Sequence, residues 1–178
     1  MAEIKSAVEL AMERTKGLRL SHEEMEKMKE EEMQSKAAGL VNRFLEVDFH
    51  LRDVEKELGK FDPRQRKHLE QLFLHHLIEA MNLDRDNDLI FQGLETFLPT
   101  SAWTVKKIKD LIQKYQSRKK DEFQKTQNDL RAGLERMGIS GSAVRPKVEG
   151  SPEWDKARSA FKPRFEEELK KLKKGILH

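Results

Sequence analysis

Apolar residues recur at intervals of three and four along most of this chain, which is the spacing of one face of an α-helix. The most regular run has the gaps 4-3-4-3-4-3-4 and comprises Met33, Ala37, Leu40, Phe44, Val47, Leu51, Val54 and Leu58. This heptad pattern over residues 33–58 predicts one unbroken, coiled-coil-like helix, the spine of the fold, which begins upstream near Ser21. Val41, Leu45 and Phe49 lie off the heptad seam, so we expect the helix to be surrounded by others in a bundle.

Start and stop signals divide the rest of the chain into further helices. Ser21 and Glu24 have the spacing of a capping box at a helix start, after a short N-terminal helix over residues 1–20. Asp62 and Pro63 begin a helix that reaches Ala80, and the short connection predicts an antiparallel hairpin with the spine. A short helix over residues 88–98 and a long one over residues 100–137 follow, and residues 21–137 together form the bundle core.

A stretch rich in glycine and proline, residues 138–151, separates this core from a basic C-terminal helix over residues 152–178. Ser151 and Pro152 start that helix, and Pro163 is expected to kink or split it because its ring cannot continue the intrahelical bonding. Without a convincing strand pattern, the predicted fold class is all-α, a multi-helix bundle.

The composition limits the classes of protein that the chain can belong to. Charged residues make up 38% and mean hydropathy is −0.81, while apolar residues still reach 37%, so long amphipathic helices with wet outer faces are expected. There is no cysteine, which excludes disulfides and thiolate chemistry. No apolar run approaches the ~20 residues that span a bilayer, and the start of the chain is too charged for a signal peptide. We therefore expect a cytoplasmic protein that does not bind membranes.

Two patterns raise the question of a metal ion. Four acidic residues have the spacing of calcium ligands in an EF-hand loop: Asp84, Asp86, Asp88 and Glu95. Leu89 occupies the position at which that loop needs glycine, so we interpret Asp86 or Asn87 as the cap of the following helix. A four-residue site would need two helices to meet at Glu46, His50, His75 and Glu79. Neither pattern repeats the ligand motif of a known metal bundle, and we predict no metal and no cofactor.

No motif indicates an enzyme. The sequence around Gly138 and Gly141 lacks both the serine elbow and the lysine-containing phosphate loop, and no strand precedes it. We therefore predict no catalytic residue.

Basic residues are concentrated in two segments and are the most usable functional signal. The segment Lys106–Lys120 contains only one acidic residue, Asp110. The segment Lys156–Lys174 carries eight Lys and Arg and three acidic residues. The candidate contacts to an anion or nucleic acid are Lys106, Lys107, Lys109, Lys114, Arg118, Lys119, Lys120, Lys170, Lys171, Lys173 and Lys174. Such lysines can neutralise the phosphates of a nucleic acid. Alternatively, they pair with the glutamates of the acidic segment Glu23–Glu32, within one chain or between chains.

The glycine- and proline-rich loop is a second candidate, because ordered connections of this length are often functional. Its expected docking residues are Ile139, Arg145, Lys147 and Trp154. The function predicted from sequence is a non-enzymatic helical scaffold that binds a protein partner or its own copy through the heptad helix. The alternative is an accessory factor that binds RNA, DNA or ribosomes through the basic helices.

Overall fold

The computed structural model describes residues 21–46, 48–141 and 144–177, and this part of the chain is all-α, as predicted. The expected N-terminal helix over residues 1–20 lies outside the described residues. A single 3-10 turn, η1 (Pro99–Ser101), accompanies the helices. The helices are α2 (His22–Phe44), α3 (Leu51–Leu58), α4 (Pro63–Ala80), α5 (Asp88–Phe97), α6 (Ala102–Arg136) and α7 (Pro152–Leu177).

One hydrophobic core joins all these helices. Phe44, Phe73 and Leu77 are fully or almost fully buried in it, and the ring of Phe44 meets Phe73 edge-on with centroids 5.9 Å apart. Gly93 in α5 allows a close approach here, because an added Cβ would lie 2.7 Å from Leu77 Cδ2 and 3.2 Å from Phe44 Cε1. The helices therefore pack closely where α2, α4 and α5 meet.

The heptad helix predicted over residues 33–58 is broken, and this prediction was wrong. Helix α2 ends at Phe44, and α3 begins at Leu51 with the Asp53 carboxylate accepting a hydrogen bond from the His50 backbone N–H (3.2 Å). An unbroken helix of this length would be about 38 Å long and would carry its last turns away from the core. The bend lets Val54 and Leu58 bury in the same core as Phe44. The seam expected to mediate self-association is thus used inside the chain's own core.

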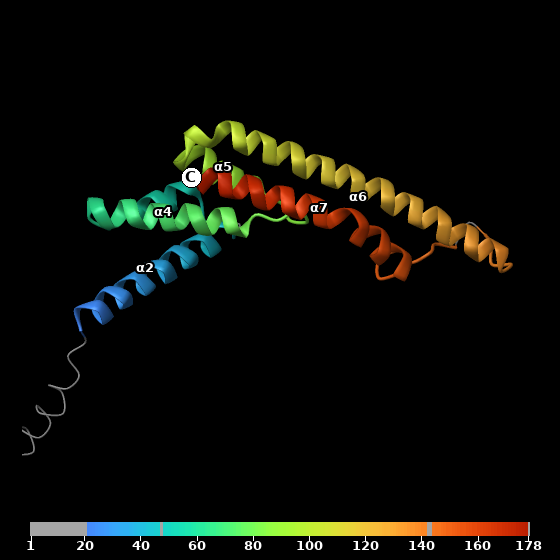
Figure 1. Ribbon diagram of the computed structural model, residues 1–178, viewed down its shortest axis with the longest axis horizontal. Coiled ribbons are helices and arrows are strands. Elements are labelled where there is room, and N and C mark those ends of the chain that lie inside the picture. Colours follow the sequence, from blue (N-terminus) through green and yellow to red (C-terminus); the bar gives the residue numbers. More distant parts are fainter. Residues whose placement is uncertain (1–20, 47, 142–143, 178) are drawn as a thin grey trace, which may run out of the picture.

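The break also changes how α2 meets α4. The short connection at residues 59–62 joins α4 to α3 and not to one long spine, so α2 is not the antiparallel partner of α4. Contacts between α2 and α4 advance in the same order along both helices, from Glu30 with His68 (2.8 Å) to Phe44 with Phe73. The two helices run in broadly the same direction in Figure 1, and the acidic half of α2 projects from the bundle.

The longest helix is α6, which lies beside α7 (Figure 1). Their part nearer the C-terminus of α7 belongs to the core, through Tyr115 on α6 and Leu169 on α7. The rest, residues 116–141 and 144–160, extends away from the other helices, and we call it the arm. Within the arm, Trp154 meets Phe123 edge-on with centroids 5.3 Å apart.

Helix α7 runs without interruption through Pro163, so the helix is not split there, and the expected kink at this proline stays a prediction. Its predicted start is confirmed, since Ser151 Oγ accepts a hydrogen bond from the Trp154 backbone N–H (3.2 Å). Antiparallel packing against α6 stabilises the helix on both sides of the proline, which offsets the lost intrahelical bond. None of the described helices combines the length and the apolar character needed to cross a membrane.

Candidate functional site

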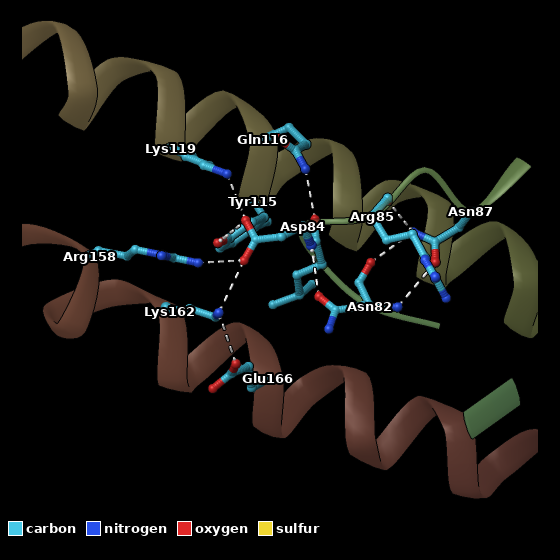
Figure 2. Close-up of polar contacts among 11 residues, drawn as sticks. Asn82, Asp84, Arg85, Asn87, Tyr115, Gln116, Lys119, Arg158, Lys162 and Glu166 are labelled. Carbon is cyan, nitrogen blue, oxygen red and sulfur yellow. Dashed lines mark hydrogen bonds and ion pairs between the residues drawn. The ribbon is translucent and has the colours of Figure 1, made fainter. Parts of the chain in front are cut away.

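Asp84 connects three parts of the fold from the loop between α4 and α5 (Figure 2). Its Oδ1 accepts hydrogen bonds from Tyr115 Oη (2.9 Å) and Lys119 Nζ (2.7 Å) of α6. Its Oδ2 accepts from Arg158 (2.7 Å) and Lys162 Nζ (3.0 Å) of α7. One carboxylate therefore holds α6 and α7 at a fixed separation beside the core.

The charges of this cluster follow from its geometry. Burial alone would raise the pKa of the Asp84 carboxyl, but the hydrogen bonds from its four partners outweigh burial and hold the pKa well below its ordinary value. Burial, followed by the hydrogen bond to Asp84, raises the pKa of Tyr115 to about 12. Asp84 is thus ionised and Tyr115 is a neutral donor at physiological pH.

The loop that carries Asp84 is itself fixed by hydrogen bonds. The Asn87 amide nitrogen donates to the carbonyls of Asn82 and Arg85 (2.8 Å each), and Gln116 of α6 donates to the Leu83 carbonyl (2.7 Å) (Figure 2). These contacts hold the loop on the core side of α6.

The acidic residues with calcium-ligand spacing make other contacts in the structure. The Asp84 carboxylate faces three cationic side chains, and Asp86 accepts a hydrogen bond from the backbone N–H of Asp88 (2.9 Å), the first residue of α5, whose N-cap is Asn87. Over the described residues, no three or more His, Asp and Glu side chains are arranged to hold a metal ion, and this includes the set Glu46, His50, His75 and Glu79.

Several of the basic residues predicted to bind an anion are used inside the molecule. Lys109 pairs with Glu95 (2.6 Å), and Lys119 belongs to the Asp84 cluster. Arg118 pairs with Glu122 one turn along α6. Lys173 donates to the Glu79 carbonyl at the end of α4 (3.0 Å), and burial lowers the pKa of this lysine.

The remaining predicted cations have no carboxylate within 4.0 Å in the described part of the chain: Lys106, Lys107, Lys114, Lys120, Lys170, Lys171 and Lys174. Lys107 places its Nζ 3.5 Å from the ring centroid of Trp103, which is 68% exposed. Such a high exposed fraction is unusual for a tryptophan, so this end of α6 is a candidate contact point for a partner.

A groove of about 780 Å³ runs between α6 and α7. Phe161 and Phe165 are half-buried in its α7 wall and contact Tyr115, with ring centroids 5.9 and 5.5 Å apart. Charged side chains of both signs line the rest: Asp110, Lys114, Arg118, Asp121 and Arg164. The groove therefore offers an apolar floor with charged margins, which suits a polypeptide segment better than a small apolar ligand.

The residues expected in the docking loop divide into two groups. Ile139, Arg145 and Lys147 are exposed, as a docking role requires. Trp154 is only 5% exposed and packs on Phe123, so its predicted availability to a partner is corrected: it anchors the arm. The arm has few other apolar side chains, so the large indole of Trp154 supplies much of the apolar contact between its two helices.

Two features of the site were not predicted from the sequence: Asp84 as a structural hub and Trp103 as an exposed aromatic. A signal for Trp103 does exist, because it lies three to four residues from charged neighbours on the same helix face. For Asp84 the partners are supplied by two distant helices, and no local pattern indicates them.

The fold and the groove define an all-α helical bundle with a surface open between two helices. Comparison with protein-family models, with curated proteins and with solved structures finds no match for this chain.

Proposed function

We propose that this chain is a non-enzymatic helical interaction protein that binds another macromolecule through the exposed face of α6 and α7. The observation that carries the proposal is the α6–α7 groove, in which the half-buried rings of Phe161 and Phe165 lie between charged side chains. A surface with an apolar centre and a charged margin is typical of protein–protein interfaces. The cytoplasmic location stays a prediction.

The groove is supported by a rigid frame. Asp84 ties Lys119 of α6 to Arg158 and Lys162 of α7, and the aromatic contacts of Tyr115 lie directly behind the groove. A surface that is already ordered loses little conformational entropy on binding, so more of the contact energy contributes to affinity.

Trp103 extends this surface toward the start of α6. Exposed tryptophans are rare on soluble proteins and are among the residues that contribute most to binding when a partner covers them. Its neighbour Lys107 adds a charge that has no carboxylate partner among the described residues.

The test is an affinity capture from a lysate of the source cells with two variants. In the first, Trp103→Ala is combined with Lys114→Glu, both at exposed positions of the proposed surface. The matched control is Lys67→Glu, an exposed lysine of α4 away from the groove. Wild type and control should capture the same partner in the presence of nuclease, and the first variant should lose most of it.

Equal capture by all three proteins, with folding verified by circular dichroism, would contradict the proposal. A partner that disappears on nuclease treatment would favour the second candidate instead.

The second candidate function is contact with RNA or DNA. It is favoured by one specific observation, the exposed Trp103 with Lys106 and Lys107 beside it, since bases stack on aromatic rings next to phosphate-binding lysines. Against it, Lys109, Arg118, Lys119 and Lys173 are engaged within the molecule.

A gel-shift assay separates the two candidates. A protein that binds nucleic acids would shift labelled single-stranded RNA at about 50 mM salt, and its affinity would fall steeply as the salt concentration rises. No shift at that salt concentration would remove this candidate and leave the protein-binding function.

A further inference from the structure

One face of α6 carries a stripe of exposed residues with a symmetric spacing. The gaps between its members are 4-3-4-4-3-4, which keeps all seven on one side of the helix. The members, which we call the α6 stripe, are Trp103, Lys107, Asp110, Lys114, Arg118, Asp121 and Lys125, all exposed.

The spacing of the stripe reads the same in both directions from Lys114. When two copies of a helix pack antiparallel about a twofold axis, a residue before the axis on one copy faces the residue equally far after the axis on the other copy. A twofold axis at Lys114 would therefore bring each stripe position of one copy against a stripe position of the other. An interface of this kind must be complementary to itself.

The chemistry of the stripe meets that requirement. Reversal about Lys114 sets Lys107 opposite Asp121 and Asp110 opposite Arg118, so each charge faces its opposite. It also sets Trp103 opposite Lys125. Lys107 lies over the ring of Trp103, which is still 68% exposed, so a second cation has room to approach it.

The axis itself is the one unfavourable position, since Lys114 faces its own copy. The cost is small at an exposed site, and Asp110 lies one helical turn away on each copy. Arg118 already pairs with Glu122, but a guanidinium has donors for more than one carboxylate.

From these observations we propose that the α6 stripe pairs with the α6 stripe of a second copy of this chain, antiparallel about an axis at Lys114. The second copy would also cover the groove beside the stripe and remove more of Phe161 and Phe165 from water. The inference rests on the proposed function, because it names the macromolecule that the α6–α7 surface binds.

The contacts are mostly between charges, so the dimer is expected to be weak and to dissociate as salt rises. The paired segment, Trp103 to Lys125, is about 33 Å long, which gives a contact along most of α6.

The test is analytical ultracentrifugation of the full chain over a range of concentrations at low salt, with charge-swapped variants. Lys107→Asp and Asp121→Lys should each weaken the dimer at least about tenfold, since each places like charges together at two symmetric positions. The double variant restores opposite charges and should recover the affinity of the wild type. Lys120→Asp, exposed but off the stripe, is the matched control and should leave the affinity unchanged.

A chain that stays monomeric at every concentration would overturn the inference, as would a dimer that the double variant does not recover. Both outcomes leave the proposed function standing if Trp103→Ala with Lys114→Glu still loses its partner in the capture experiment. Loss of the dimer in the single variants, with recovery in the double variant, would establish the pairing independently of any other partner.

Discussion

Asp84 accepts hydrogen bonds from groups on two helices that are remote from it in the sequence. Its side chain is 23% exposed, and its carboxylate is the acceptor for three cations and one phenol. Removal of the carboxylate would leave those cations without their shared counter-charge next to the core. Asp84 therefore adds to the aromatic contacts of Tyr115 in fixing α7 on α6.

Replacement of Asp84 by alanine is expected to lower the free energy of unfolding by about 2 kcal/mol, the loss expected for charge-assisted hydrogen bonds at a partly buried site. Chemical denaturation measures the change. Asp129→Ala, an exposed aspartate on α6, is the control and should change stability by less than about 0.5 kcal/mol. An equal effect of the two substitutions would show that the cluster contributes nothing special.

The same carboxylate predicts a dependence of stability on pH. Its pKa in the folded chain is lower than the unfolded value of about 3.9, so its contribution is complete above that pH and is lost as pH falls toward the folded pKa. The difference in stability between wild type and Asp84→Asn should thus be constant near neutral pH and shrink below about pH 4. A difference that grows on acidification would contradict the assignment.

The two tryptophans are expected to report opposite environments. Trp103 is 68% exposed and Trp154 is 5% exposed. The fluorescence of Trp154→Phe, which retains Trp103, should be strongly quenched by iodide, whereas Trp103→Phe should be almost unaffected. Similar quenching of the two variants would disprove the anchoring role of Trp154.

At the level of residues, the local capping contacts could be predicted from the sequence, and the long-range side-chain contacts could not. Ser21 and Glu24 form the predicted capping box, with hydrogen bonds of 2.7 and 3.1 Å, and Asp62 caps α4 as predicted. Each of these depends on residues two or three positions apart. The role of Asp84 depends on side chains that α6 and α7 bring to it when the whole chain folds, and the local acidic pattern gives no sign of them.

At the level of helices, the helical type of the segments followed from apolar spacing, but the bend that makes α3 a separate helix did not. The heptad pattern continues in register from Phe44 to Leu51, although α2 ends at the first of these residues and α3 begins at the second. Phe49 packs against the core from within this turn, and Arg43 lies over its ring at 4.2 Å. A periodic pattern indicates which side chains are buried and does not show whether one straight helix buries them.

The tight packing of α5 gives a prediction with an internal control. Gly93→Ala should lower the free energy of unfolding by about 1 kcal/mol, because its Cβ would press on Leu77 and Phe44 in a core without free space. Gly133→Ala in α6 has nothing within 4 Å of the added Cβ and should raise stability by about 0.5 to 1 kcal/mol through helix propensity. Thermal melts of both variants measure these changes. The opposite order of the two stabilities would contradict the packing described for α5.

At the scale of the whole molecule, the chain presents two different surfaces that extend from one bundle. The exposed half of α2 carries six glutamates against two lysines between Glu23 and Glu32, whereas the α6–α7 surface combines aromatic rings with charges of both signs. The fold class could be predicted from composition and spacing. The groove could not, because it exists only when α7 lies back along α6.

The central claim is that the α6–α7 face contacts another macromolecule, and site-specific photo-cross-linking in the source cells tests it most directly. A photo-reactive amino acid in place of Lys114 lies on the claimed surface, and one in place of Lys67 on α4 is the control. We expect a discrete cross-linked product from position 114 and none from position 67, with the mass of the product showing whether the partner is a second copy. No product from position 114, or the same product from both positions, would contradict it.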